Sequence, residues 1–84
     1  MSGDYDYTLS GEAVRMLLGA ATKKRRKAEA ILESLAKDPF MAPDFVEVAP
    51  SGRRFGVNVF GDVIVTSWVD HGAKEIRIVA IEFV

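Results

Sequence analysis

The spacing of apolar residues predicts a short strand and two helices in the first half of the chain. Residues 5–9 alternate between apolar and polar side chains, as in a half-buried strand. Residues 10–20 and 23–37 carry apolar side chains at the spacing of amphipathic helices. Ser10 can cap the first helix, and Asp38-Pro39 ends the second, because the residue before a proline avoids the helical conformation. We therefore expect an αα-hairpin whose core side chains are Val14, Leu17, Leu18, Ile31, Leu32 and Leu35.

Short apolar runs separated by turn residues predict strands in the second half. They cover residues 45–48, 54–60, 63–69 and 75–84, with turns at Gly61-Asp62 and Asp70-His71-Gly72. The first run is flanked by prolines, so we expect an edge strand there. In the second run Phe55, Val57 and Val59 share one face, while Gly56 and Asn58 share the other. The last three runs form an antiparallel β-meander, and the N-terminal strand and αα-hairpin packed on it give an α+β fold.

Length and composition fit one small domain. A chain of 84 residues with 49% hydrophobic residues can form one core, so residues 1–84 make a single domain. The absence of cysteine excludes disulfide bonds and thiolate metal sites and favours a reducing compartment. The N-terminus is acidic and polar, and no apolar run reaches the ~20 residues that a membrane span needs. We expect a cytoplasmic protein with no membrane contact, no metal and no cofactor.

Positive charge is concentrated in one short segment. Eleven basic against twelve acidic side chains give a net charge of −1, which argues against a general affinity for RNA or DNA. Five of the cations are consecutive, namely Lys23, Lys24, Arg25, Arg26 and Lys27. Such a cluster can bind phosphate groups or an acidic protein surface, because clustered cations release counterions on binding. The same segment can also be an ordinary solvated junction between the two helices.

Two further arginines and one histidine allow both a functional and a structural interpretation. Arg53 and Arg54 stand at the start of a predicted strand, where they can contact phosphate or act as charges that discourage edge pairing. His71 is the only histidine, the residue type that most often does acid–base work near neutrality, yet its place in a turn also fits an exposed residue without chemistry. Trp68 can stack on a base or pack within the fold. The candidate binding set is therefore the basic segment together with Arg53 and Arg54.

The order of these elements resembles the RelE/ParE superfamily of bacterial toxin–antitoxin and plasmid-stabilisation proteins. The residues that carry the resemblance are YTLSGEAVRMLLGAATKKRRKAEAILESLAKDPF near the start and WVDHGAKEIRIVAIEF near the end. Together they cover more than half of the chain. The resemblance implies a toxin that is either a ribosome-dependent messenger-RNA endonuclease or an inhibitor of DNA gyrase. It also implies an antitoxin protein that holds the toxin inactive.

The catalytic residues that the resemblance implies are missing from this sequence. RNA-cutting members carry basic residues on the sheet and a basic or aromatic residue just beyond the last strand. The matching positions are Gly56, Asn58 and Ile64, and Phe83 or Val84 at the end, after which we expect no tail. None of these side chains can supply the acid, base or cation that phosphodiester cleavage needs. We expect a toxin-type protein without RelE-type ribonuclease chemistry and without catalytic residues, acting through protein or nucleic-acid binding. The alternative is a non-toxic descendant that serves as an interaction or homodimerisation module.

Overall fold

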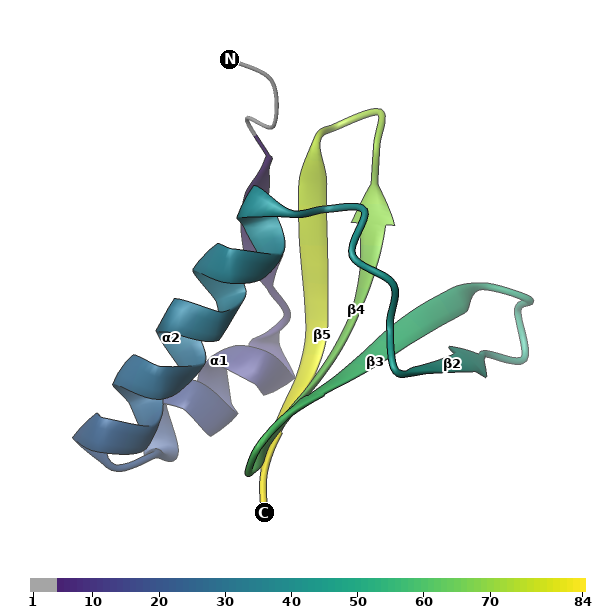
Figure 1. Cartoon of the computed structure of the whole chain (residues 1–84). Coiled ribbons are helices and arrows are strands. Elements are labelled where there is room, and N and C mark those ends of the chain that lie inside the picture. The colour runs from purple at the N-terminus through teal and green to yellow at the C-terminus, as the bar shows by residue number, and fades with distance from the viewer. Residues whose placement is uncertain (1–4) are drawn as a thin grey trace.

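The fold is a five-stranded sheet with two helices on one of its faces (Figure 1). The structure is a computed structural model and describes residues 5–84. Its elements are β1 (Asp6–Leu9), α1 (Gly11–Gly19), α2 (Thr22–Lys37), β2 (Phe45–Val48), β3 (Arg54–Phe60), β4 (Val63–Asp70) and β5 (Glu75–Phe83). The predicted α+β architecture is confirmed, with every predicted element present. Within the described residues neither helix is long and apolar enough to cross a membrane.

The strand order across the sheet is β1-β5-β4-β3-β2. The pairs β2–β3, β3–β4 and β4–β5 are antiparallel, so the predicted meander is confirmed and β2 extends it as an edge strand. Strand β1 pairs with β5 in parallel, with Tyr7 opposite Ile76 and Leu9 opposite Ile78. The first and last strands are therefore neighbours, while β2 and the start of β3 project away from the helices (Figure 1).

Helix α1 is fixed to the sheet through its first residues. The Ser10 side chain accepts a hydrogen bond from the Ala13 backbone nitrogen at 3.1 Å, which confirms the predicted cap. Its hydroxyl also donates to the Val79 carbonyl at 2.9 Å. This anchoring turns Ala13 and Leu17 toward the core, whereas Leu18 is 68% exposed. The prediction that Leu18 packs in the core is therefore wrong. Adjacent residues of a helix point about 100° apart, so only one of the two leucines can face the sheet, and the hydrogen bonds of Ser10 orient α1 so that this residue is Leu17.

The core lies between α2 and the central strands. Leu32 is fully buried, and Ile31 and Leu35 are nearly so, which confirms the predicted stripe of α2. From the sheet the buried aliphatic residues are Val63, Val65, Ile76, Ile78 and Ile81. Val79 is skipped in the pairing of β4 with β5, so the core-facing side of β5 passes from Ile78 to Ile81.

The pairing of β3 with β4 decides which face of β3 meets the helices. Gly56 lies opposite Ser67 and Asn58 lies opposite Val65. Since Val65 belongs to the core, Gly56 and Asn58 face the helices, and Val57 and Val59 face the opposite side of the sheet. The predicted alternation along β3 is thus correct. The face of β3 that carries Gly56 and Asn58 is the one that points toward the helices.

Candidate functional site

The basic segment, residues 23–27, occupies the first turns of α2. The helix begins at Thr22 behind Ala21, which makes no side-chain capping bond, and its first turn holds no acidic residue. Backbone N–H groups at an uncapped helix start remain available and carry partial positive charge. The five cations add to this charge, so this end of α2 favours an anion more strongly than the sequence alone implies.

Part of the basic segment is already used within the fold. Lys27 forms an ion pair of 2.6 Å with Asp62 in the β3–β4 turn, and this hydrogen bond lowers the pKa of the Asp62 carboxyl. The ammonium of Lys24 lies 6.0 Å from the centre of the Phe83 ring. Among the described residues, Lys23 and Arg26 are exposed and take part in no ion pair. These two side chains therefore form the part of the segment most available to a partner.

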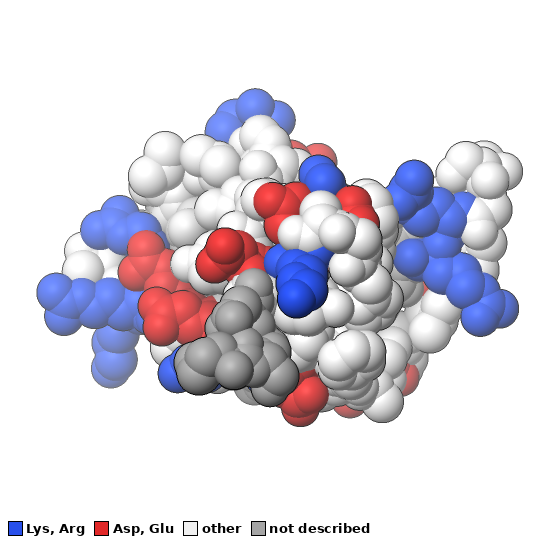
Figure 2. All heavy atoms as spheres, turned by 90° about the horizontal axis from the view of Figure 1, so that it is seen from above, with Lys and Arg blue, Asp and Glu red and all other residues white. Residues whose placement is uncertain are grey.

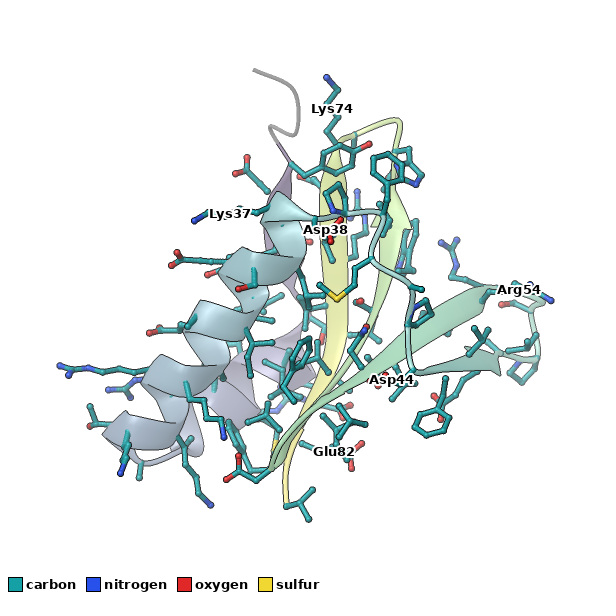
Figure 3. The ribbon with its side chains drawn as sticks, viewed as in Figure 1. Lys37, Asp38, Asp44, Arg54, Lys74 and Glu82 are labelled. Atoms are coloured by element: carbon teal, nitrogen blue, oxygen red, sulfur yellow. The ribbon has the colours of Figure 1, made fainter. Side chains whose placement is uncertain are left out.

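Arg53 and Arg54 lie at the other end of the molecule. Figure 3 places Arg54 at the tip of the β2–β3 hairpin, far from the start of α2. Figure 2 shows basic side chains gathered at the left and right ends, with acidic side chains and a few further basic ones between them. The structure therefore does not bring Arg53 and Arg54 together with the basic segment, and the candidate set is two separate sites.

The guanidinium of Arg53 stacks over Trp68 at 4.0 Å from the ring centre. Arg77 approaches the same ring at 5.4 Å and pairs with Asp70 at 3.3 Å and Glu75 at 3.0 Å. The pKa of Asp70 is lowered, first by the hydrogen bond from the Ala73 backbone nitrogen. Sequence reasoning missed Arg77, although its place between two buried isoleucines predicts an outward side chain. Arg53 is thus held against the sheet, and Trp68 is covered by arginine on this face.

His71 takes part in an exposed aromatic cluster. Its Nδ1 lies 2.8 Å from the Tyr5 hydroxyl, and its ring stacks on Phe40 with 5.1 Å between ring centres. The cluster joins the segment before β1, the β4–β5 turn and the loop between α2 and β2. These contacts are structural, and they fix the start of that loop.

The positions at which the resemblance implies catalytic residues do not form one site. Gly56 and Asn58 face the helices, whereas Ile64 pairs with Val59 on the opposite face. A β-carbon on Gly56 would lie 3.0 Å from Cβ of Pro43, so the loop of residues 38–44 packs directly on this strand. Asn58 is buried, and its Nδ2 lies 3.9 Å from the Met41 sulfur. Cations are thus absent at these positions, and the loop crowds Gly56.

A hollow of about 300 Å³ lies beside this loop, between the end of α2 and the inner face of the sheet. Apolar side chains supply most of its walls, with Leu35 from α2, Met41 and Pro43 from the loop, and Ile76 from β5. Asn58 and Ser67 lie among them, and Asp38 and Arg54, both exposed, also line it. No charged group is buried there.

Comparison with known proteins gives matches in structure only. No protein-family model matches the chain, and no curated protein matches it. The toxin–antitoxin complex RelBE2 from Mycobacterium tuberculosis matches with a TM-score of 0.75 and 13% identity over 96% of this chain and 99% of that chain. The archaeal RelE–RelB complex from Pyrococcus horikoshii matches with 0.73 and 16%, over 95% and 94% of the two chains. The isolated Escherichia coli RelE toxin matches with 0.75 and 9%, over 94% and 83%. This chain therefore has the fold of the RelE toxins.

Proposed function

We propose that this protein is the toxin-type component of a toxin–antitoxin pair and acts by binding an anionic partner, without cutting messenger RNA by the RelE mechanism. The proposal rests mainly on the residues at the inner face of β3, which lack charge although the chain has the fold of the RelE toxins. At the implied catalytic positions this face presents Gly56 and Asn58, and the loop of residues 38–44 packs over them.

Two independent effects oppose cleavage at this place. Losing one group that stabilises transition-state charge costs about 10²–10³ in rate, and no cation stands at Gly56, Asn58 or Ile64. The contact between Pro43 and Gly56 also crowds position 56, so a side chain added there would press against the loop. A lysine at position 56 alone would therefore not restore the chemistry, because its side chain would first have to displace the loop.

Binding is supported at the basic segment. Lys23 and Arg26 are exposed at an uncapped helix start. Their charge and the partial positive charge of the free N–H groups therefore attract an anion to the same end of α2. The protein carries a net charge of −1, so the attraction of an anion to this end is local and not a property of the whole molecule. Such binding weakens steeply with salt, because it depends on released counterions. Ribosomal RNA, messenger RNA and an acidic surface of gyrase are the partners that this chemistry fits.

An antitoxin partner is supported by the structural neighbours and by the β2 edge. Two of the neighbours described above, RelBE2 and the archaeal RelE–RelB complex, are toxin–antitoxin complexes. In this chain β2 has a free edge, and Phe45, Val46 and Val48 are 62%, 54% and 59% exposed. An extended segment of a partner can add to such an edge through backbone hydrogen bonds. The same exposed edge favours the second candidate, a non-toxic module that pairs with its own copy.

Growth after induced expression tests the toxin assignment, and primer extension on programmed ribosomes tests the mechanism. We expect growth arrest that is relieved by co-expression of the proposed antitoxin, with no codon-positioned cleavage by the purified protein. The triply reversed variant Lys23→Glu, Arg25→Glu, Arg26→Glu should lose the arrest. Lys37→Glu, which reverses a charge at the opposite end of the same helix, is the matched control and should keep it.

Other outcomes have definite meanings. Cleavage that persists in a nuclease-free preparation would refute the proposed mechanism. Normal growth, together with a dimer in light scattering, would refute the toxin assignment and favour the homodimerisation module. Arrest that survives reversal of Lys23, Arg25 and Arg26 would place the binding surface away from the basic segment.

A further inference from the structure

The hollow beside the α2–β2 loop has a floor unlike the rest of the core. Three positions of the sheet form this floor, and they are neighbours across two strands, since Gly56 lies opposite Ser67 and Asn58 lies two residues further along β3. Elsewhere the inner face of the sheet is aliphatic, as at Val63, Val65 and Ile78. The missing side chain of Gly56 keeps the space above Ser67 open.

Two polar side chains are buried in this floor without strong internal partners. Asn58 is 6% exposed and Ser67 is 7% exposed. Among the described residues, the side chain of Asn58 makes only the weak contact with the Met41 sulfur, and the Ser67 hydroxyl makes no hydrogen bond. Both residues line the hollow, so their polar atoms face its open space. Among the described residues only the Arg77 Nε is fully buried without a hydrogen-bond partner, so the polar atoms of Asn58 and Ser67 keep contact with the solvent in the hollow. A ligand that displaces this solvent must offer hydrogen bonds in its place.

We propose that this hollow binds a small uncharged molecule that carries a carboxamide group on an apolar or aromatic body. The Asn58 amide offers two N–H donors and a carbonyl oxygen that accepts, and the Ser67 hydroxyl can donate or accept. A carboxamide matches this pair, because it also presents a donor and an acceptor side by side. The walls from Leu35, Met41 and Ile76 receive the apolar body.

Charge and size support an uncharged ligand of modest size. The two charged residues that line the hollow, Asp38 and Arg54, are exposed and of opposite sign, so the hollow has no net preference for a cation or an anion. A volume of about 300 Å³ equals that of about ten water molecules. This volume is at the lower end of the range found for ligand sites and accommodates one aromatic ring with its amide.

Benzamide is the probe for the test, with benzoate and toluene as comparison ligands of the same ring size. Each is titrated into ¹⁵N-labelled protein while the amide signals of Gly56 and Ser67 and the side-chain amide of Asn58 are followed. We expect benzamide to shift these signals in a saturable way, and to bind at least about tenfold more tightly than benzoate or toluene. That factor is the usual contribution of one well-formed hydrogen bond to a preformed site.

Variants assign the binding to the polar floor. Asn58→Val and Ser67→Ala should each weaken benzamide about tenfold and leave toluene unchanged. Thr66→Ala, on the opposite face of the same strand, is the matched control and should bind benzamide like the original protein. Equal affinity for benzamide and toluene, no saturable shift, or unchanged binding by Asn58→Val would each overturn the proposal. The backbone spectrum of every variant verifies that it is folded, and the test is independent of toxicity.

Discussion

Gly56→Ala tests whether the α2–β2 loop packs on β3 as described, because the sign of its effect depends on Pro43. In a strand, alanine is ordinarily more stable than glycine by about 0.5–1 kcal/mol. Here the new β-carbon would lie 3.0 Å from Cβ of Pro43. Overpacking of this kind costs about 1–3 kcal/mol, which exceeds the gain. We therefore expect Gly56→Ala to lower the free energy of unfolding by about 1 kcal/mol.

The effect should reverse once the loop contact is removed. Pro43→Gly deletes Cβ and Cγ, the two Pro43 atoms that approach position 56, at 3.0 and 3.4 Å. In that background Gly56→Ala should raise the free energy of unfolding by about 0.5–1 kcal/mol. The double-mutant cycle cancels the cost of the loop glycine itself. Gly19→Ala is the control, because no atom lies within 4 Å of its added β-carbon, and it should have the same effect in both backgrounds.

Urea unfolding followed by circular dichroism measures these differences, provided that the dependence on urea is the same for all variants. If Gly56→Ala stabilises the protein in both backgrounds, the loop does not press on this strand. The argument that the implied catalytic positions are covered would then be wrong, and only the absence of cations would oppose ribonuclease activity.

Three further predictions concern the core, the turn and the hollow. Leu32→Ala should lower the free energy of unfolding by about 2–5 kcal/mol in urea, whereas Leu18→Ala should change it by less than about 0.5 kcal/mol; a large effect at Leu18 would contradict its exposure. Because the pKa of Asp62 is lowered from its ordinary value of 3.8, the stability gained from Lys27 is present above that value and lost as pH falls through the folded-state pKa. Thermal unfolding of Asp62→Asn should thus approach the original protein in acid and fall below it near neutrality; a constant gap would exclude this linkage. Asn58→Val should raise the free energy of unfolding by about 1 kcal/mol in urea, and a loss of stability would mean that Asn58 has a structural partner.

The helices and strands could be predicted from the sequence because each depends on residues that are close together in the chain. The α2 stripe, the Ser10 cap and the turn at Gly61 are encoded by neighbouring residues, and all of them are present. Leu18 was misplaced because α1 is short and two adjacent leucines compete for one buried direction. Only the bonds from Ser10 to β5, far away in the sequence, select Leu17.

The candidate site was harder to predict because it depends on how distant segments meet. The sequence shows that Gly56 and Asn58 share a face, but the pairing with β4 is needed to know that this face is the inner one. Similarly, no local pattern tells that Pro43 covers Gly56, or that Arg53 stacks on Trp68. The assignment of the basic segment and of Arg53 and Arg54 to an anionic partner stays a prediction.

The parallel pairing of β1 with β5 has a consequence for synthesis in the cell. Strand β1 has no other neighbour in the sheet, and three core isoleucines belong to β5, namely Ile76, Ile78 and Ile81. A ribosome adding about 5–20 residues per second needs seconds to pass from Leu9 to Glu75. Throughout that time the first strand and both helices lack the surface on which they pack. The β2–β3 and β3–β4 pairs can form earlier, but the first strand cannot join the sheet until β5 has left the ribosome.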